Sequence, residues 1–164
     1  DVSASIFVAA YVPFMAGFVM LTLAADDGSK RVVVFILLTV ANDIGGYAAG
    51  VFFGKHPIAA QISPKKSWEG FAGSLVVQSA VGAAAFVLLL DAPWWQGVLA
   101  GVVLTVTATA GDFAESAIKR DLGIKDMGRL LPGHGGMMDR LDSLIPNAFA
   151  SWVIFSVFLG SGIG

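Results

Sequence analysis

Five long apolar runs alternate with shorter polar segments along the chain. They cover Ile6–Leu23, Val32–Phe53, Phe71–Leu90, Trp94–Ala110 and Pro146–Gly164. Crossing the hydrocarbon core of a bilayer takes roughly 20 apolar residues in a helix, and each run is close to that length. The pattern therefore predicts an all-α fold, a polytopic membrane helix bundle with about five transmembrane helices.

Composition supports a membrane protein. Of the 164 residues, 56% are hydrophobic and only 13% are charged, with a mean hydropathy of +0.78, whereas soluble domains carry about 25% charged residues. No fixed repeat or low-complexity linker divides the chain, so we expect a single domain over residues 1–164. The sequence contains no Cys, which excludes disulfides, thiolate metal sites and cysteine nucleophiles.

The basic residues indicate an orientation in the membrane. Five crossings place the segments Lys55–Gly70 and Asp112–Ile145 on the same side. Eight of the ten Lys and Arg lie there: Lys55, Lys65, Lys66, Lys119, Arg120, Lys125, Arg129 and Arg140. By the positive-inside rule, both segments are predicted to be cytoplasmic and the C-terminus to lie outside.

Small residues recur at four-residue spacing in two of the apolar runs. Gly46, Gly50 and Gly54 form one such series, and Gly97 and Gly101 form another. Small faces of this kind allow helices to approach closely in a membrane. The faces would serve packing within the chain or a homodimer equally well.

Asn42 and Asp43 lie near the middle of the second apolar run. A carboxylate at that depth is costly and normally faces a partner, a cavity or an ion. Asp43 is either a structural residue paired with a Lys from another helix or part of a polar cavity open to the cytoplasm, and we favour the cavity. Gly45 and Gly46 directly follow and could break the helix locally, which would let backbone groups join the site.

Two adjacent Lys precede the third apolar run. Lys65 and Lys66 stand beside Ser67, which we predict to be a helix N-cap. Positive charge combined with free backbone N–H groups at a helix start suits a phosphate. The alternative is an anchor that faces anionic lipid headgroups, with Trp68 in the interface, and the local sequence does not decide between them.

The segment between the last two runs mixes carboxylates with basic groups. Asp112, Glu115 and Lys119 have helical spacing and should share one face of an extended fourth helix, while a helix starting near Met137 would align Asp139 with Asp142. Carboxylates hold Mg²⁺ and basic groups neutralise phosphoryl oxygens. The mixture therefore indicates a site for a hard divalent cation together with a polyphosphate.

A glycine-rich turn, Pro132-Gly133-His134-Gly135-Gly136, lies within this segment. Such a turn can bring backbone N–H groups close to an anion. His134 is either a ligand of that anion or a loop histidine that hydrogen-bonds locally. It does not form a zinc site, because His56 is the only other His and the chain has no Cys.

Taken together, these residues resemble the CDP-diacylglycerol synthases, or phosphatidate cytidylyltransferases. The family pattern is matched without a gap by Ser116, Ile118, Lys119-Arg120, Lys125-Asp126, Gly128, Pro132, His134-Gly135-Gly136, Asp139-Arg140 and Asp142. Upstream, ISPKKSWEG over residues 62–70 resembles the family's ISPKKTWEG element, and segments 42–47 and 111–116 resemble two further elements. The resemblance covers roughly Val32–Ser143.

The resemblance implies transfer of a cytidylyl group from CTP to phosphatidate, with Mg²⁺ and an additional monovalent or divalent cation as candidate cofactors. The protein would bind CTP and membrane phosphatidate, and it would not bind nucleic acid. The expected location is the bacterial inner membrane, with the active site facing the cytoplasm. Family members usually carry more helices upstream, so we expect this chain to be the C-terminal part of a longer enzyme.

The resemblance also suggests residue roles. Metal ligands would be Asp112, Asp139 and Asp142, with Asp43 as a further carboxylate that either binds metal or faces the substrate. Phosphoryl charge would be neutralised by Lys65, Lys66, Lys119, Arg120 and Arg140, while His134 would orient a phosphate or protonate the leaving group. Further substrate contacts would come from Ser63, Ser67, Lys125, Gly135 and Gly136.

Two alternatives use the same features differently. A CTP-dependent enzyme that acts on an ether-lipid phosphate or a polyprenol would share the polar machinery. A secondary transporter would explain Asp43 and the glycine-interrupted helices, but it would leave the charged segment 112–145 without a purpose.

Overall fold

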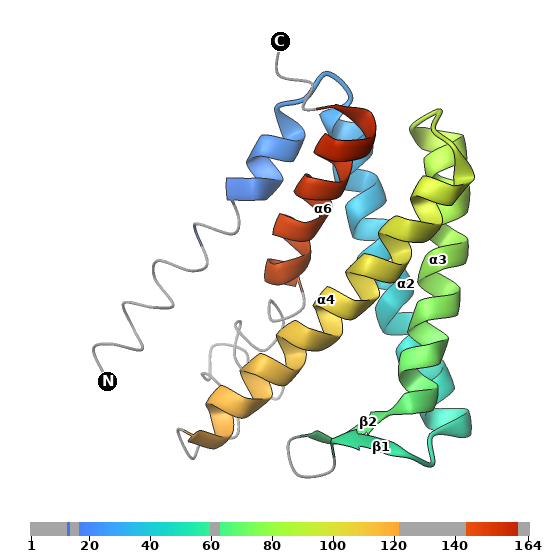
Figure 1. Cartoon of the computed structure of the whole chain (residues 1–164), viewed down its shortest axis with the longest axis vertical. Helices are drawn as coiled ribbons and strands as arrows, with labels where there is room; N and C mark the ends of the chain where they lie inside the picture. Colours follow the sequence, from blue (N-terminus) through green and yellow to red (C-terminus); the bar gives the residue numbers. More distant parts are fainter. Residues whose placement is uncertain (1–12, 14–16, 60–62, 122–143, 161–164) are drawn as a thin grey trace, which may run out of the picture.

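A computed structural model describes residues 13, 17–59, 63–121 and 144–160 of the chain (Figure 1). Residues 17–23 are helical and are followed by α2 (Gly28–Phe53). A hairpin of β1 (Pro57–Ala59) and β2 (Ser63–Ser67) then leads into α3 (Trp68–Leu89). The remaining helices are α4 (Trp94–Asp121) and α6 (Leu144–Leu159).

The prediction of an all-α membrane helix bundle is confirmed. Within the described residues, three helices are long and apolar enough to cross a membrane: Gly28–Phe53, Trp68–Leu89 and Trp94–Ala114. A shorter apolar helix covers Pro146–Leu159. α4 continues to Asp121, beyond the apolar run that predicted it, so the fourth helix is extended as expected.

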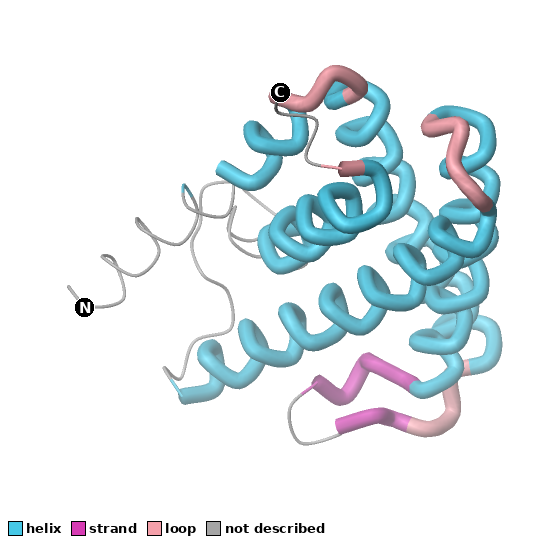
Figure 2. Tube along the Cα trace, turned by 45° about the horizontal axis from the view of Figure 1, so that its top comes forward, coloured by secondary structure: helices cyan, strands magenta, loops and turns pink. Residues whose placement is uncertain are grey.

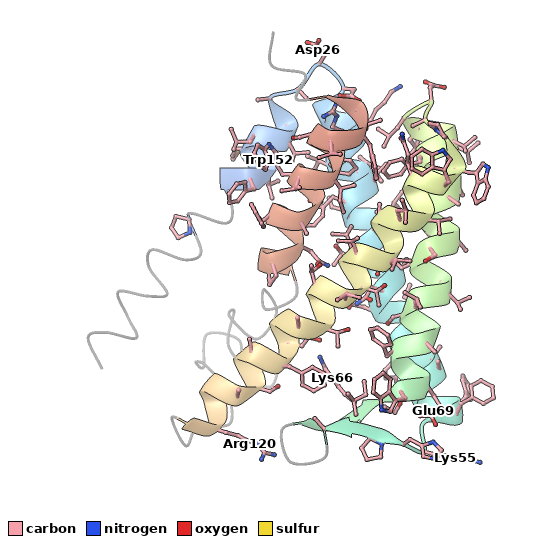
Figure 3. All side chains as sticks on the ribbon, in the orientation of Figure 1. Asp26, Lys55, Lys66, Glu69, Arg120 and Trp152 are labelled. Carbon is pink, nitrogen blue, oxygen red and sulfur yellow. The ribbon has the colours of Figure 1, made fainter. Side chains whose placement is uncertain are left out.

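The hairpin end of the bundle carries several charged residues. Figure 3 shows Lys55, Lys66, Glu69 and Arg120 at the end where the hairpin lies, whereas Asp26 lies at the opposite end. α2 and α4 both run toward the hairpin end, and α3 runs away from it (Figure 1). The alternation of connections predicted for these three helices is therefore observed.

α2 and α3 pack through glycines, and this corrects one prediction. α2 runs without interruption from Gly28 to Phe53, so Gly45 and Gly46 do not break the helix. A Cβ atom at Gly45 would lie 2.7 Å from the carbonyl oxygen of Gly73, and one at Gly46 would lie 2.5 Å from the hydroxyl of Ser74. The two glycines are needed for close approach of α3, and helical backbone satisfies their hydrogen bonds.

α3 and α4 pack in the same way. A Cβ atom at Gly97 would fall on the carbonyl group of Gly82, and one at Gly101 would lie 2.7 Å from the Cα of Ser79. Small residues at four-residue spacing thus serve packing within the chain, as expected for membrane helices. A homodimer stays a prediction.

The hairpin was not predicted. β1 and β2 are antiparallel, with Pro57 opposite Ser67 and Ala59 opposite Ser63 (Figure 2). Lys65 and Lys66 therefore lie on β2, directly before the start of α3. Proline in the helix interior is unfavourable, and Pro57 and Pro64 keep both arms extended. Ser67 is the N-cap of α3, as predicted, and its hydroxyl accepts a hydrogen bond from the N–H of Gly70 at 3.1 Å.

The interior of the bundle contains apolar and polar contacts. Phe86 and Phe155 stack with ring centroids 6.0 Å apart and are almost fully buried. The buried hydroxyl of Thr105 donates to Gln78 Oε1 at 2.5 Å, linking α4 to α3. The Thr107 hydroxyl donates to Asn147 Oδ1 at 2.5 Å, linking α4 to α6. These bonds join all three helices within their apolar surroundings.

At the end of the bundle opposite the hairpin, Arg31 connects α2 to α6. Its side chain is buried and pairs with Asp27 at 2.6 Å. The guanidinium also donates to the carbonyl oxygens of Gly160, at 2.8 Å, and Leu159, at 3.5 Å. A cation at the C-terminal end of α6 is favourably placed relative to the helix dipole. Arg31 therefore ties the start of α2 to the end of α6.

Candidate active site

A polar cavity of about 190 Å³ lies where α2, α3, α4 and the hairpin meet. Each of these four elements contributes to its wall. The lining residues are Asn42, Asp43, Gly46, Tyr47, Gly50, Ile58, Lys66, Ser67, Gly70, Phe71, Ser74, Thr109 and Asp112. The cavity thus brings together side chains that are up to 70 positions apart in the sequence (112 minus 42).

Lys66 and Asp112 form an ion pair in this cavity. The Lys66 ammonium contacts Oδ2 of Asp112, and about a quarter of each side chain is exposed. The same ammonium stands 5.1 Å from the ring centroid of Phe113, in a cation–π contact. The three groups fix the end of β2 against α4, and Figure 3 shows Lys66 between these elements.

Asp43 supplies a second carboxylate to the cavity from α2. Its side chain is exposed, and its Oδ1 accepts a long hydrogen bond of 3.5 Å from the Asn42 amide. The Ser74 hydroxyl donates to the backbone carbonyl oxygen of Asn42 at 2.7 Å, which holds this turn of α2 against α3. Asp43 thus lies in the same cavity as Lys66 and Asp112.

The hairpin is anchored beside the cavity by Glu69, in the first turn of α3. One carboxylate oxygen is 2.6 Å from Nδ1 of His56. The other accepts hydrogen bonds from the backbone N–H groups of Lys55 and His56, both at 3.3 Å. The N–H of Trp68 donates to the His56 carbonyl oxygen at 2.9 Å. The base of the hairpin is therefore closed by contacts that converge on His56.

The structure describes only some of the other predicted site residues. Arg120 is exposed in the last turn of α4, and Lys119 precedes it in the same helix. Ser63 and Lys65 lie on β2, but the structure describes only their backbone. The remaining predicted site residues lie outside the described residues: Lys125, His134, Gly135, Gly136, Asp139, Arg140 and Asp142.

Sequence reasoning missed several residues of the cavity wall. Ser74 and Thr109 contribute hydroxyl groups, and Tyr47 and Phe71 contribute aromatic rings. Helical spacing could have found some of them, because Ser67, Gly70 and Ser74 share one face of α3 and Thr109 precedes Asp112 by three positions. Isolated Ser and Thr in membrane helices commonly bond their own backbone, so their presence alone did not mark a site.

The donor groups of the cavity fit a hard cation. Asp43 and Asp112 offer carboxylate oxygens and Asn42 offers an amide oxygen, which are the ligand types that Mg²⁺ takes. Within the described ranges no three His, Cys, Asp or Glu side chains gather as a metal site. Asp139 and Asp142, which lie outside those ranges, are the predicted additional ligands.

Comparisons with known proteins agree with the motifs. A sequence model described as "Cytidylyltransferase family" matches residues 1–158. The chain is 51% identical over 157 residues to a phosphatidate cytidylyltransferase from Mycobacterium leprae, covering 96% of this chain and 50% of that protein. A relative of the same name from Helicobacter pylori is 32% identical, covering 90% of this chain and 59% of that protein. The chain thus spans about half the length of the curated relatives it matches.

Proposed function

Because this chain belongs to the cytidylyltransferase family, we propose that it carries out nucleotidyl transfer from CTP to phosphatidate. The products would be CDP-diacylglycerol and pyrophosphate. The observation that carries this proposal is the cavity in which Lys66 meets Asp112 and Asp43 at the charged end of apolar helices. The names of the relatives, phosphatidate cytidylyltransferases, support phosphatidate as the acceptor.

The reaction needs no nucleophile from the protein, because a phosphate oxygen of the lipid attacks. What it needs is neutralisation of the negative charge on the two substrates. A phosphate oxygen of phosphatidate attacks the α-phosphorus of CTP, a new P–O bond forms, and the bond to the β-phosphate breaks as pyrophosphate leaves. The attacking oxygen is already anionic near neutral pH. Repulsion between the two anions is the obstacle, so positioning and electrostatic stabilisation should supply most of the catalysis.

Lys66 is the described residue best placed for this task. Its ammonium stands in the cavity, where it pairs with Asp112. When a polyphosphate enters, the ammonium can exchange the carboxylate for a phosphoryl oxygen. A charge-assisted hydrogen bond of that kind is stronger than a neutral one, and it would hold the nucleotide next to α4.

We propose that the Asp112 carboxylate then contacts a cation. Asp112 and Asp43 would hold Mg²⁺ together with the predicted ligands Asp139 and Asp142, and an additional monovalent or divalent cation belongs to the same proposal. Mg²⁺ would supply neutralisation of charge on the CTP phosphates when bound. Lys119, Arg120 and Arg140 are proposed to neutralise further phosphoryl charge, with His134 near the leaving group.

The position of the cavity suits a substrate that is half lipid. Its wall includes Tyr47 and Phe71 along with the charged groups, and it lies at the end of helices that are apolar enough to span a membrane. We propose that this end faces the cytoplasm in a bacterial inner membrane, because eight of the ten Lys and Arg lie in the two segments assigned to that side.

A direct assay tests the proposal. The full-length natural protein, purified in detergent, is incubated with CTP, Mg²⁺ and phosphatidate in mixed micelles, and the lipid product is identified by mass spectrometry. CDP-diacylglycerol and an equal amount of pyrophosphate are expected. Polyprenyl phosphate and ether-lipid phosphate serve as competing acceptors. Failure with phosphatidate, or a strong preference for another acceptor, would overturn the assignment.

A further inference from the structure

We propose that Glu69 is a positioning residue: it holds the base of the hairpin so that Lys66 stands in the cavity against Asp112. This inference rests on the function proposed above for Lys66. Glu69 is not among the described residues that line the cavity. It would act through the hairpin and would not touch the substrate.

Glu69 gathers three donors that lie 13 and 14 positions earlier in the chain. The two backbone N–H groups belong to Lys55 and His56, which follow the end of α2, and the third donor is the His56 ring. These contacts join the exit from α2 to the first turn of α3. A carboxylate in the first turn of a helix is also favoured by the helix dipole.

The hairpin needs such an anchor. A two-stranded hairpin is at best marginally stable on its own, and β1 has only three residues. Its ladder shifts register between Pro57 and Ala59. Pro57 also lacks a backbone N–H and cannot donate to the ladder. The contacts of Glu69 and the bond from Trp68 to His56 therefore define where the hairpin begins.

The position of Lys66 depends directly on this base. Lys66 is next to Ser67, which pairs with Pro57 across the hairpin and caps α3. A shift of His56 and Pro57 would change the path of β2 at that point. From the observed path of β2, the ammonium of Lys66 reaches Asp112 on α4. Glu69 thus links the geometry of the α2–β1 turn to the charged pair in the cavity.

Three substitutions separate positioning from other roles. Glu69→Ala removes all three contacts. Glu69→Gln keeps the length of the side chain and an oxygen that can accept from the backbone N–H groups, so it should restore most of the geometry. Lys55→Ala is the matched control at the same turn, since Lys55 contacts Glu69 through its backbone N–H, which the variant retains.

The first measurement does not depend on catalysis. Spin labels are placed on the hairpin and on α4 by Ala59→Cys and Ala114→Cys in the full-length protein, after any Cys outside this chain has been replaced by Ser. This chain itself has no Cys. Electron–electron distance measurements in nanodiscs should give one narrow distribution for the labelled parent and the Lys55→Ala variant. Glu69→Ala should broaden it and Glu69→Gln should restore it.

The second measurement uses the transfer reaction. A misplacement of about 1 Å can cost on the order of 100-fold in rate, so Glu69→Ala should lower kcat/KM by about that factor, with a raised KM for CTP. Partial unfolding alone would lower kcat and leave KM unchanged. Glu69→Gln should recover most of the loss, and Lys55→Ala should match the parent.

The outcomes distinguish the two proposals. A narrow, unshifted distance distribution in Glu69→Ala would overturn the positioning role, whatever the enzyme does. An unchanged KM for CTP in an active Glu69→Ala enzyme would also overturn it. A parent that shows no transfer to phosphatidate, but whose hairpin broadens in Glu69→Ala, would contradict the proposed function and leave the anchoring role of Glu69 standing.

Discussion

Lys66 and Asp112 are 46 positions apart and form an ion pair that joins the hairpin to α4 across the polar cavity. In a metal–nucleotide complex, the positive Lys66 would suit the phosphates and the negative Asp112 would suit the metal ion. In the structure, the two side chains neutralise each other. Binding of a polyphosphate to Lys66 should therefore favour binding of a cation to Asp112, and the reverse. Each ligand competes with the ion pair between these two residues.

Lys66→Gln should weaken the binding of CTP. The variant removes a cation from the cavity, and hydrogen bonds to charged groups contribute about 1.5–3 kcal/mol. With about 1.4 kcal/mol for each factor of ten, the KM for CTP should rise roughly 10- to 100-fold in steady-state assays. Lys55→Gln, an exposed Lys at the same end of the bundle, is the control. Equal KM values in the two variants would contradict a nucleotide role for Lys66.

Asp112→Asn should remove most of the Mg²⁺-dependent transfer. The amide cannot balance a cation or the Lys66 ammonium, and loss of one electrostatic contribution of this kind costs roughly 100- to 1000-fold in rate. Initial rates are measured over a range of Mg²⁺ concentrations, and size-exclusion chromatography checks the fold. Asp26→Asn, at the opposite end of the bundle, should behave like the parent. A nearly normal rate for Asp112→Asn would exclude it as a metal ligand.

Gly97→Ala should destabilise the bundle. The added methyl group would collide with the carbonyl group of Gly82, which is backbone and cannot rotate away. Overpacking of this kind costs about 1–3 kcal/mol, so the melting temperature in detergent should fall by several degrees. Gly17→Ala is the control, because among the described residues no atom outside the neighbouring helix backbone lies within 4 Å of the added group. A melting temperature for Gly97→Ala as high as that of the control would argue against the close α3–α4 contact.

Arg31→Ala should loosen the end of the bundle that lies away from the cavity. The substitution removes the pair with Asp27 and the bonds to the C-terminal carbonyls of α6. Each charged hydrogen bond contributes about 1.5–3 kcal/mol, and a drop in melting temperature is expected. The exposed neighbour Lys30 provides the control Lys30→Ala. Because the site is remote, the KM for CTP should not change in the folded fraction.

The helices themselves could be predicted from hydrophobicity, with errors at their ends. α2 begins at Gly28, four residues before the apolar run at Val32, and α4 ends at Asp121, eleven residues beyond Ala110. Polar residues can continue a helix outside the hydrocarbon layer, so the apolar run marks the part that spans and not the whole helix. The hairpin could not be predicted in this way, because its residues have no apolar period.

The uninterrupted course of α2 also depended on tertiary structure. Gly45 and Gly46 read as a helix break because glycine is a poor helix former. In the bundle, their missing side chains let α3 approach, with Gly73 and Ser74 directly opposite. The free energy gained by close packing of α2 against α3 outweighs the low helix propensity of the two glycines.

The sequence by itself determined that this is an apolar helical protein of the cytidylyltransferase family, since hydrophobic length and motif spacing are local properties of the chain. It also identified Asp43, Lys66 and Asp112 as separate candidates. Only the tertiary structure decided that all three line one cavity and that Lys66 contacts Asp112. Those relationships depend on glycine contacts between helices and on a hairpin anchored by Glu69, which join residues too distant in sequence for any local pattern to report.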